Sequence, residues 1–318
     1  MVKIKDKVSA NIFMFSTYFY IIGNYNTHWR KYMKIGIDIG GSHIAIAKVQ
    51  ENKILDKKEY NYDESFKKEI RKNIVKYIKQ EVSEILKKEK IEKVGISIAG
   101  RLKENTLYIS PNLKQLEGIN FVETLEPYLQ IPVTVNKDSF CAGKAEKIYG
   151  CLNNYQTAVF LIIGTGIGAI SYRNNNLQRD GYGHMIIEKN GRQCKCGKKG
   201  CFETYGSITA LKKSLQEYLK VENMTGKEVH DYLEAHQNEE AIKILIDNYI
   251  QNFCTGLSSI IDIAVGFGGS FSYYEDLFLE RIQNKFKTEK LLADDKSIPK
   301  FEFGDLKNDA GIIGATLF

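Results

Sequence analysis

The sequence predicts an α/β protein made of two similar halves with a cleft between them. Strand-like and helix-like patterns alternate from Met33 onward. A strand, a glycine turn and a second strand occur at 34–50 and again at 157–172, which indicates an internal duplication. Because no Pro- or Ser-rich linker separates the halves, we expect a hinge between them rather than a flexible tether.

The first half begins with a three-stranded meander. The apolar run "KIGIDI" predicts a buried strand, and "HIAIAKVQ" and "KILDKKEY" predict the next two strands. Isoleucines and a valine at helical spacing predict one amphipathic helix over 64–89, whose charges form a solvated face. The remaining elements expected in this half are strands at 93–100 and 132–135 and helices at 121–129 and 139–149.

The second half repeats the opening pattern and then becomes largely helical. After the strands of 157–172 we expect a loop over 173–201 that contains glycines and cysteines. A helix over 202–220 and a helical tract from about 237 to 262 follow. The strand "IAVGFGG" and a closing helix that starts near "DAGIIGATLF" complete the chain.

Composition and charge argue for a folded protein that does not bind nucleic acid. Of the 318 residues, 43% are hydrophobic and 26% are charged, which is a globular composition. The formal net charge is +6, but residues 1–32 carry +4 of it, with Asp6 as their one acidic residue. The body has no dense run of Lys and Arg with interleaved aromatics of the kind that follows a phosphate backbone.

Residues 1–32 are interpreted as an N-terminal extension that is not part of the fold. The apolar stretch "NIFMFSTYFYII" has only about a dozen residues, and a membrane-spanning helix needs about 20. No small-residue cleavage site follows it. We therefore expect a cytoplasmic protein without a membrane partner, and a peripheral membrane or partner anchor is the alternative role for this segment.

Six cysteines occur in a chain without an export signal, so a disulfide framework is not expected. Cys141, Cys151 and Cys254 lie in apolar contexts of helical pattern, and we expect them to be small buried side chains.

The other three cysteines form a candidate metal site. The segment "CKCGKKGC" contains Cys194, Cys196 and Cys201, and His184 precedes the first by ten residues. Three thiolates and one imidazole are a donor set for a closed tetrahedral zinc site. Glycines 197 and 200 let the chain double back so that the sulfurs can point inward. Since four protein ligands leave no open position, the metal would be structural; the alternative is a loop with chance cysteines.

Three glycine loops are candidate nucleotide-binding elements, although each alone would be an ordinary turn. In "DIGGS" the backbone N–H groups can face phosphate oxygens, Ser42 adds a hydroxyl donor, and Asp38 can hold a magnesium-bound water. "GTGIG" repeats the arrangement with Thr165 as the donor, and "GFGGS" offers bare backbone to a flat ring. The glycines concerned are Gly40, Gly41, Gly164, Gly166, Gly268 and Gly269. The Walker lysine pattern and the dinucleotide fingerprint are both absent.

From Met33 to Phe318 the sequence resembles the ROK family of sugar kinases and repressors, which belongs to the actin and hexokinase-like superfamily. The motifs that carry the resemblance are "GIDIGGS", "SPNL", "GTGIG", "GH" followed by "CKCGKKGCFETYGS", "GFGGS" and "DAGIIGA". The resemblance implies two ribonuclease-H-like lobes, which we place at 33–142 plus 303–318 and at 143–302, the second with the zinc loop. It also implies a structural zinc on His184 and the three cysteines, magnesium with ATP, and a homodimer.

The resemblance further implies roles for individual residues. Asp138, at the head of the helix over 139–149, matches the catalytic aspartate of the family, and helix N-capping is its alternative role. Asn112 in "SPNL" matches a sugar-binding asparagine and is otherwise a turn residue. Glu203 and His184 match residues at the sugar; a carboxylate stabilised by the helix dipole is the alternative for Glu203.

Two positions depart from the family pattern. In "NKDSF", Lys137 stands where a sugar-contacting asparagine is expected, and Gly181 in "DGYGH" replaces a second family carboxylate. We expect Lys137 to favour the charged form of Asp138 and so to make it a weaker base. Gly181 would remove an acceptor near the C1/C2 end of the sugar, and Asp180 could substitute for it.

The predicted function is ATP-dependent phosphorylation of a hexose primary hydroxyl by a glucokinase-like enzyme. Glucose is the default substrate, and the two departures favour an amino, N-acylated or negatively charged hexose. A catalytically weak sugar or nucleotide sensor of the same fold is the first alternative. A sugar-responsive repressor is the second alternative. It is placed after the sensor because such proteins carry a winged helix-turn-helix ahead of the core, and only 32 residues precede Met33 here.

Overall fold

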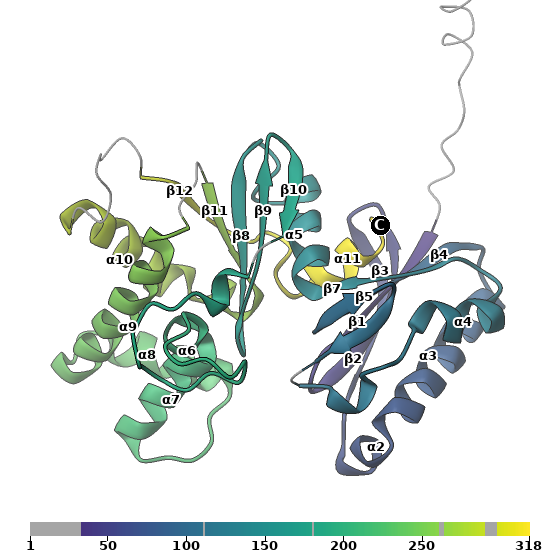
Figure 1. Cartoon of the computed structure of the whole chain (residues 1–318), viewed down its shortest axis with the longest axis horizontal. Helices are drawn as coiled ribbons and strands as arrows, with labels where there is room; N and C mark the ends of the chain where they lie inside the picture. Colours follow the sequence, from purple (N-terminus) through teal and green to yellow (C-terminus); the bar gives the residue numbers. More distant parts are fainter. Residues whose placement is uncertain (1–32, 111, 180, 261–263, 290–297) are drawn as a thin grey trace, which may run out of the picture. The chain divides into compact units, whose positions relative to one another are not determined.

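The computed structural model describes residues 33–110, 112–179, 181–260, 264–289 and 298–318, and residues 33–318 form one compact unit. The N-terminal extension, residues 1–32, therefore lies outside the described residues. Two five-stranded sheets organise the unit, in the orders β3-β2-β1-β4-β7 and β10-β9-β8-β11-β12 (Figure 1).

The first sheet contains the predicted meander. The strands β1 and β2 pair antiparallel, and β1–β4 and β4–β7 pair parallel. The elements of this half are β1 Met33–Ile39, β2 His43–Gln50, β3 Lys53–Asn61, α2 Glu64–Lys68, α3 Ile70–Leu86, β4 Ile91–Ile98, β5 Arg101–Lys103, β6 Thr106–Ile109, η1 Lys114–Leu116, α4 Phe121–Leu129, β7 Val133–Lys137 and α5 Asp138–Tyr149.

The second sheet has the same topology, which confirms the internal duplication. The strands β8 and β9 pair antiparallel, and β8–β11 and β11–β12 pair parallel. The elements are β8 Ala158–Ile163, β9 Ile167–Arg173, β10 Asn176–Arg179, η2 Tyr182–His184, α6 Glu203–Gly206, α7 Ile208–Leu219, α8 Gly226–His236, α9 Glu240–Ser258, β11 Ala264–Gly268, η3 Gly269–Tyr274, α10 Glu275–Thr288, β12 Lys300–Phe303, η5 Lys307–Asp309 and α11 Ala310–Ala315.

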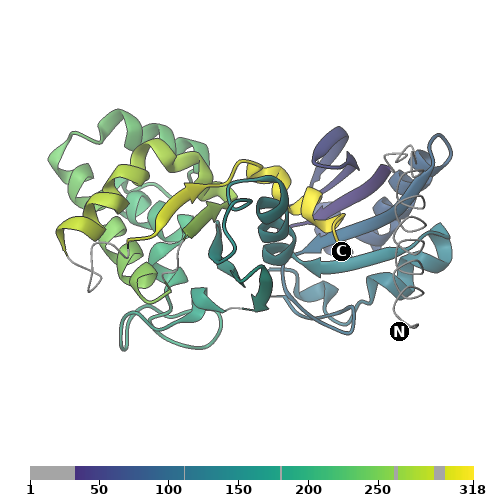
Figure 2. The same cartoon turned by 90° about the horizontal axis from the view of Figure 1, so that it is seen from above.

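The last helix, α11, packs on the first sheet, and both views show it in yellow beside α5 (Figures 1 and 2). Glycines allow this close approach. A Cβ on Gly36 of β1 would lie 2.4 Å from the Ile312 carbonyl oxygen, and one on Gly314 would lie 1.7 Å from the Cys141 oxygen. The chain end therefore packs closely on the first sheet and on α5.

Two expected helices are each divided. The predicted helix 64–89 breaks at Glu69, where φ −124° and ψ 41° leave the helical region. The predicted helix 202–220 breaks at Ser207, whose side chain accepts a hydrogen bond from the Ala210 N–H and caps α7. Helical periodicity continues through both breaks, so the apolar pattern alone does not reveal them.

Several elements of the structure are not predicted from the sequence, and one cysteine lies outside the helix in which it is expected. The hairpin β5–β6, the strands β10 and β12 and the helices α8 and α10 were not predicted. Cys141 and Cys254 are buried in helices as expected, but Cys151 lies in the turn after α5 and is half-buried. Within the residues described, no helix combines the length and apolar character required to cross a bilayer.

Candidate active site and metal centre

The first glycine turn lies at one end of the strand that carries Asp38. Asp38 is half-buried, and its Oδ1 accepts a hydrogen bond of 2.5 Å from the hydroxyl of Ser97, its register partner on β4. Burial raises the pKa of Asp38, while the Ser97 hydrogen bond lowers it in part. A Cβ on Gly41 would lie 3.2 Å from Asn112 Cβ, so the turn and the "SPNL" segment are adjacent.

Asp138 begins α5 directly after β7. Since β1, β4 and β7 are parallel, Asp38 and Asp138 emerge at the same edge of the sheet, where ligands of open α/β sheets bind. Oδ1 of Asp138 accepts from the Ser139 N–H at 2.6 Å. Burial raises the pKa of Asp138 to about 6, and the charge of Asp38 adds to this, whereas Lys137 and the Ser139 N–H lower it.

Lys137 acts on Asp138 in the expected direction, but it does not set the net pKa. Lys137 does lower the pKa of Asp138, but burial has the larger effect and raises it. Lys137 is half-buried, and its Nζ lies 5.9 Å from the centre of the Phe140 ring. Sequence alone shows a neighbouring charge but not the depth at which a carboxyl group sits.

The other two glycine loops lie side by side on the second sheet. "GTGIG" is the turn between β8 and β9, and "GFGGS" follows β11, which is parallel to β8. Gly269 has φ +68°, a conformation that favours glycine, and a Cβ there would lie 2.8 Å from the Ile163 oxygen. A Cβ on Gly164 would lie 3.6 Å from Ser270 Oγ, and Thr165 is exposed.

The "GTGIG" turn also contacts the start of α5 and the first residue of α6. A Cβ on Gly168 would lie 3.1 Å from Ser139 Cβ, and one on Gly166 would lie 2.6 Å from Glu203 Oε2. Ser139, which follows Asp138, has a buried hydroxyl without a hydrogen-bond partner. Glu203 and Ser139, the residue that follows Asp138, therefore both lie next to this turn.

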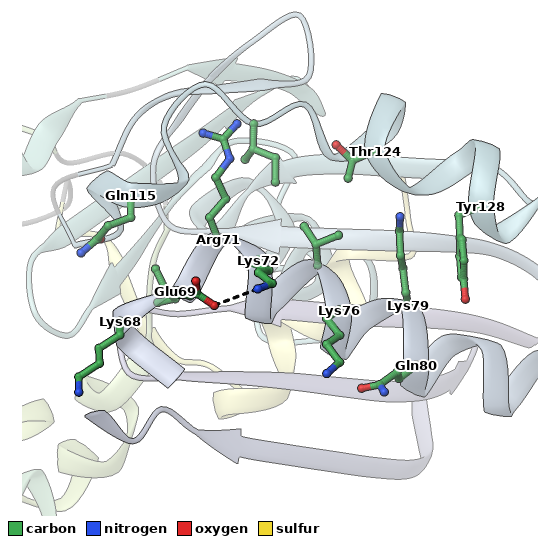
Figure 3. A pocket seen from close by; sticks show the side chains of 13 residues that line it. Lys68, Glu69, Arg71, Lys72, Lys76, Lys79, Gln80, Gln115, Thr124 and Tyr128 are labelled. Carbon is green, nitrogen blue, oxygen red and sulfur yellow. Dashed lines mark hydrogen bonds and ion pairs between the residues drawn. The ribbon is translucent and has the colours of Figure 1, made fainter. Parts of the chain in front are cut away.

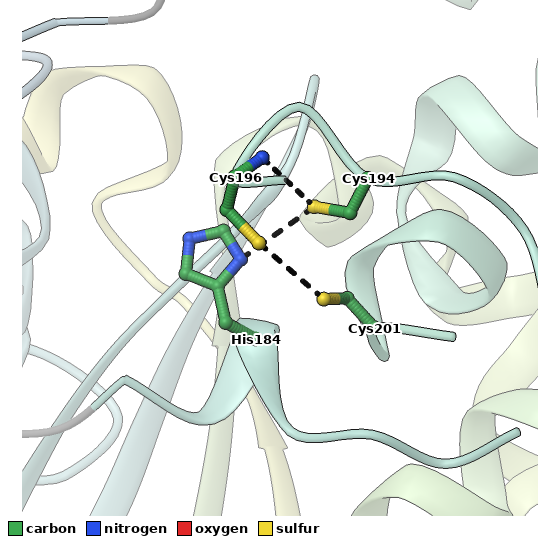
Figure 4. A group of neighbouring side chains, drawn as sticks. All are labelled: His184, Cys194, Cys196 and Cys201. Carbon is green, nitrogen blue, oxygen red and sulfur yellow. Dashed lines mark hydrogen bonds between the residues drawn. The ribbon is translucent and has the colours of Figure 1, made fainter. Parts of the chain in front are cut away.

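The four predicted metal ligands come together (Figure 4). The side-chain donor atoms of His184, Cys194, Cys196 and Cys201 all lie within 4.8 Å of one another. The sulfurs of Cys196 and Cys201 are 3.6 Å apart, close to the roughly 3.8 Å expected for two thiolates on a tetrahedral zinc. His184 Nδ1 lies 3.8 Å from the Cys194 sulfur.

Two glycines shape this loop as the sequence predicts. Gly197 has φ +91° and Gly200 has φ +79°. A Cβ on Gly200 would lie 1.7 Å from the Glu188 oxygen, so only glycine fits. The soft donor set and the donor separations both suit zinc.

Glu203 connects the metal ligands with the "GTGIG" turn. Its Oε1 lies 2.9 Å from the Cys194 sulfur and 3.4 Å from His184 Nδ1. Its Oε2 lies 3.5 Å from the Ile167 N–H. A folded "CKCGKKGC" loop is thus required to hold this carboxylate in place.

Gly181, one of the two departures from the family pattern, has open surroundings. A Cβ on Gly181 would meet no atom within 4 Å, and its φ of −122° is open to any residue. Asp180, the suggested substitute, lies outside the described residues.

The sequence does not predict the roles of two residues of the site. Ser97 is hidden in an apolar strand, and nothing in its context indicates the bond to Asp38. Gly311 lies in the quoted "DAGIIGA" motif, and a Cβ there would lie 3.2 Å from Asp38 Oδ1. The sequence shows Gly311 in this motif, but it does not show that Gly311 lies next to Asp38.

Comparisons with known proteins agree on one family. The model of the ROK family matches residues 34–318. The chain is 28% identical over 239 residues to the xylose repressor of Bacillus subtilis (strain 168), a match that covers 72% of this chain and 60% of the repressor, so the chain spans less than two thirds of that relative. It is 27% identical over 268 residues to the N-acetylmannosamine kinase of Vibrio cholerae (strain O395), covering 80% of this chain and 89% of the kinase.

A solved structure shares the fold. The ROK family glucokinase from Streptomyces griseus in complex with glucose and AMPPNP superposes with a TM-score of 0.75 at 25% identity, covering 89% of this chain and 97% of that one. The match to the family model spans nearly all of the chain from the first strand to the last helix, and the chain therefore belongs to the ROK family.

Proposed function

We propose that this protein is an ATP-dependent hexose kinase with Asp138 as its general base. The observation that carries the proposal is a half-buried carboxyl group whose pKa is raised to about 6, at the sheet edge that also presents Asp38. A base with a pKa near the working pH is suited to accept the proton of a sugar hydroxyl. The similarity to a glucokinase and to an N-acetylmannosamine kinase supports the same reaction class.

The residues around Asp138 fit magnesium and a nucleotide. Oδ1 of Asp38 accepts from Ser97, which leaves Oδ2 for a magnesium-bound water, and a carboxylate is a preferred ligand type for this ion. A cation there would also offset the burial that raises the pKa of Asp38. MgATP supplies the phosphoryl group and neutralises its charge when it is bound. The backbone N–H groups of "DIGGS" and "GTGIG", with Ser42 and Thr165, would bind the phosphates, and "GFGGS" would offer its backbone to the flat ring.

The sugar would be oriented by Asn112, Glu203 and His184. Glu203 contacts the "GTGIG" turn and the metal ligands, so its carboxylate is fixed before substrate binds. Zinc on His184 and the three cysteines would hold this loop and take no part in the chemistry. The homodimer, the cytoplasmic location and the boundaries of the lobes stay predictions.

We infer a substrate that differs from glucose at C2, an amino or N-acylated hexose. The open space around Gly181 supports this inference, because a Cβ there would meet no atom of the described residues within 4 Å. Lys137 in place of an asparagine also favours a negatively charged sugar as an alternative.

A substrate panel tests the proposal. Full-length protein with ATP and Mg²⁺ is assayed for ADP release with glucose, glucosamine, N-acetylglucosamine, N-acetylmannosamine and a hexuronic acid, and Asp138→Asn serves as the inactive control. We expect turnover with an N-acylated or amino hexose above that with glucose. Tight sugar binding by calorimetry with no turnover on any sugar would favour the sensor instead.

The xylose repressor similarity favours one further candidate, a sugar-responsive regulator. Binding of duplex DNA at low salt, released by a sugar, would support it. Loss of all binding above about 0.2 M salt without a sequence preference would indicate ordinary electrostatic attraction.

A further inference from the structure

The side of α3 that faces α4 carries a groove of about 720 Å³ (Figure 3). Its apolar lining comes from Ile70, Val75 and Ile119. Five cations also line it, and these are Lys68, Arg71, Lys72, Lys76 and Lys79. Among the described lining residues Glu69 is the one carboxylate. Sequence periodicity alone assigns these charges to a solvated helix face.

Three of the cations follow the repeat of α3. Lys72 and Lys76 are four residues apart, about 6 Å along the helix axis, and Lys79 is about 4.5 Å further on. Lys68 ends α2, before the break at Glu69. In Figure 3, Lys68 and Gln115 lie near one end and Lys79 and Tyr128 near the other.

Three of these five cations already have partners and two are available. Arg71 donates to the Glu117 carbonyl oxygen at 3.3 Å. Lys72 forms an ion pair of 3.1 Å with Glu69, and Lys79 Nζ lies 4.6 Å from the centre of the Tyr128 ring. Lys68 and Lys76 are exposed, and neither forms an ion pair with a residue that the structure describes. Uncompensated positive charge beside an apolar floor indicates a ligand that is both acidic and apolar.

We propose that this groove binds an acidic amphipathic helix of a partner protein. Glu or Asp residues at i and i+4 of such a helix would repeat with the same spacing as Lys72 and Lys76, and its apolar side would cover Ile70, Val75 and Ile119. The four exposed cations at the rim leave the groove too open to enclose a small molecule, which pockets bury by 70–90%. The chain's own residues 1–32 carry +4 and would be repelled. The proposal is independent of the kinase reaction.

A designed peptide tests the proposal with the full-length protein. The probe is a labelled 16-residue helix with Leu on one side and Glu at every fourth position of the other, and a scrambled peptide of identical composition is the first control. Fluorescence anisotropy is measured at 0.05 M and 0.3 M salt. The amphipathic peptide should bind at least tenfold more tightly than the scrambled peptide. The double variant Lys68→Glu/Lys76→Glu should weaken that binding at least tenfold.

A matched variant separates the groove from general charge effects. Lys88→Glu/Lys90→Glu changes two exposed lysines just beyond α3 and alters the net charge by the same amount. It should leave peptide affinity within about twofold. Circular dichroism of both double variants confirms that each is folded.

Several outcomes would overturn the proposal. These are equal binding of the scrambled peptide, equal loss in the two double variants, absence of binding at low salt, or tighter binding of inorganic polyphosphate or single-stranded RNA than of the helical peptide. The last result would assign the groove to a polyanion of another class.

Discussion

At the scale of single residues, the proposed site depends on two carboxyl groups that burial makes harder to ionise. Burial raises the pKa of both Asp38 and Asp138, and the charge of Asp38 also disfavours ionisation of Asp138. Lys137 is the cation that acts against this effect at Asp138. Because a general base must be ionised, the balance between burial and Lys137 would set the lowest pH at which the proposed kinase reaction proceeds.

The pH profile of kcat/KM provides the first prediction, because this ratio reports the pKa values of the free protein. Activity should fall below about pH 6 as Asp138 is protonated, and Lys137→Met should move this acidic limb to higher pH because it removes the charge that lowers the pKa. Asp138→Asn should lower kcat by about 10²-fold to 10⁴-fold. An acidic limb that is unchanged or shifted to lower pH in Lys137→Met would contradict this role.

Stability measurements distinguish lost chemistry from lost folding. The pKa of Asp138 is higher in the folded protein than its ordinary value of 3.8, so this residue's stabilising contribution is complete below about pH 4 and is lost as pH rises through about 6. Asp138→Asn removes that loss. At pH 7 the variant should therefore be at least as stable to urea as the parent protein.

A second prediction concerns the open position at Gly181. Gly181→Glu should fold normally, since a Cβ meets nothing within 4 Å and the backbone is already in a region open to other residues. If the missing carboxylate limits glucose recognition, KM for glucose should fall about tenfold with little change in kcat. Gly181→Gln is the isosteric control. An equal gain in both variants would assign the effect to shape and not to charge.

At the scale of elements, Glu146 joins α5 to the turn after this helix and to the connection from β12 to α11. It is fully buried, and its carboxylate accepts from the N–H groups of Leu306 at 2.9 Å, Cys151 at 3.0 Å and Asp305 at 3.2 Å. These segments include the connection from β12 to α11, near the hinge expected around 142 and 303. Glu146 therefore fixes the helix that presents Asp138.

Removal of this carboxylate should be costly. Glu146→Ala leaves three backbone donors unsatisfied in the interior, and we expect a loss of at least about 3 kcal/mol in the free energy of unfolding. Glu146→Gln keeps one acceptor and should lose less. Urea denaturation measures both, with Glu84→Gln, an exposed partner of Lys87, as a control that should change little. Equal stability of Glu146→Ala and the parent would contradict the assignment.

The "CKCGKKGC" loop is a second element whose stability can be tested. Purified protein should contain about one zinc per chain, and Cys196→Ser should lower both metal content and thermal stability. Because Glu203 contacts Cys194 and His184, chelation should also raise KM for the sugar. Cys151→Ser, outside the cluster, should retain the metal. A metal-free preparation with unchanged stability and KM would exclude a structural zinc.

At the scale of the whole molecule, the last residues complete an apolar cluster to which both sheets contribute. Ile312 and Ile313 of α11 are buried, and a Cβ on Gly95 of β4 would lie 2.0 Å from the Ala315 oxygen. Lysines hold the final carbonyl groups, since Lys34 donates to Thr316 at 3.3 Å and Lys144 to Leu317 at 2.6 Å. The first sheet is therefore finished only when the chain end has docked.

Truncation tests this dependence. Deletion of 310–318 exposes apolar surface of β1 and β4 and removes two buried isoleucines, each worth about 1.5–3 kcal/mol. Because a domain is stable by only about 5–15 kcal/mol, the truncated chain should lose cooperative unfolding, as measured by calorimetry. Ile244→Ala, an exposed isoleucine on α9, is the control and should leave the transition unchanged.

The sequence by itself determined the duplicated strand pattern, the glycine turns and the metal-ligand set. These features are local: strand periodicity, glycine spacing and the grouping of Cys194, Cys196 and Cys201 are each contained in short segments. It also identified Asp138, but only through the resemblance to a family. It did not reveal Ser97 or Glu146, whose partners lie far away along the chain.

Only the tertiary structure decided how these groups behave. Whether Asp138 is a weak or a tuned base depends on how much water the fold removes around it, and that burial outweighs the adjacent lysine. Whether the α3 lysines are a solvated face or the rim of a groove depends on α4, which lies some forty residues further on in the chain. Desolvation and concavity arise from contacts between distant segments, so no local pattern contains them.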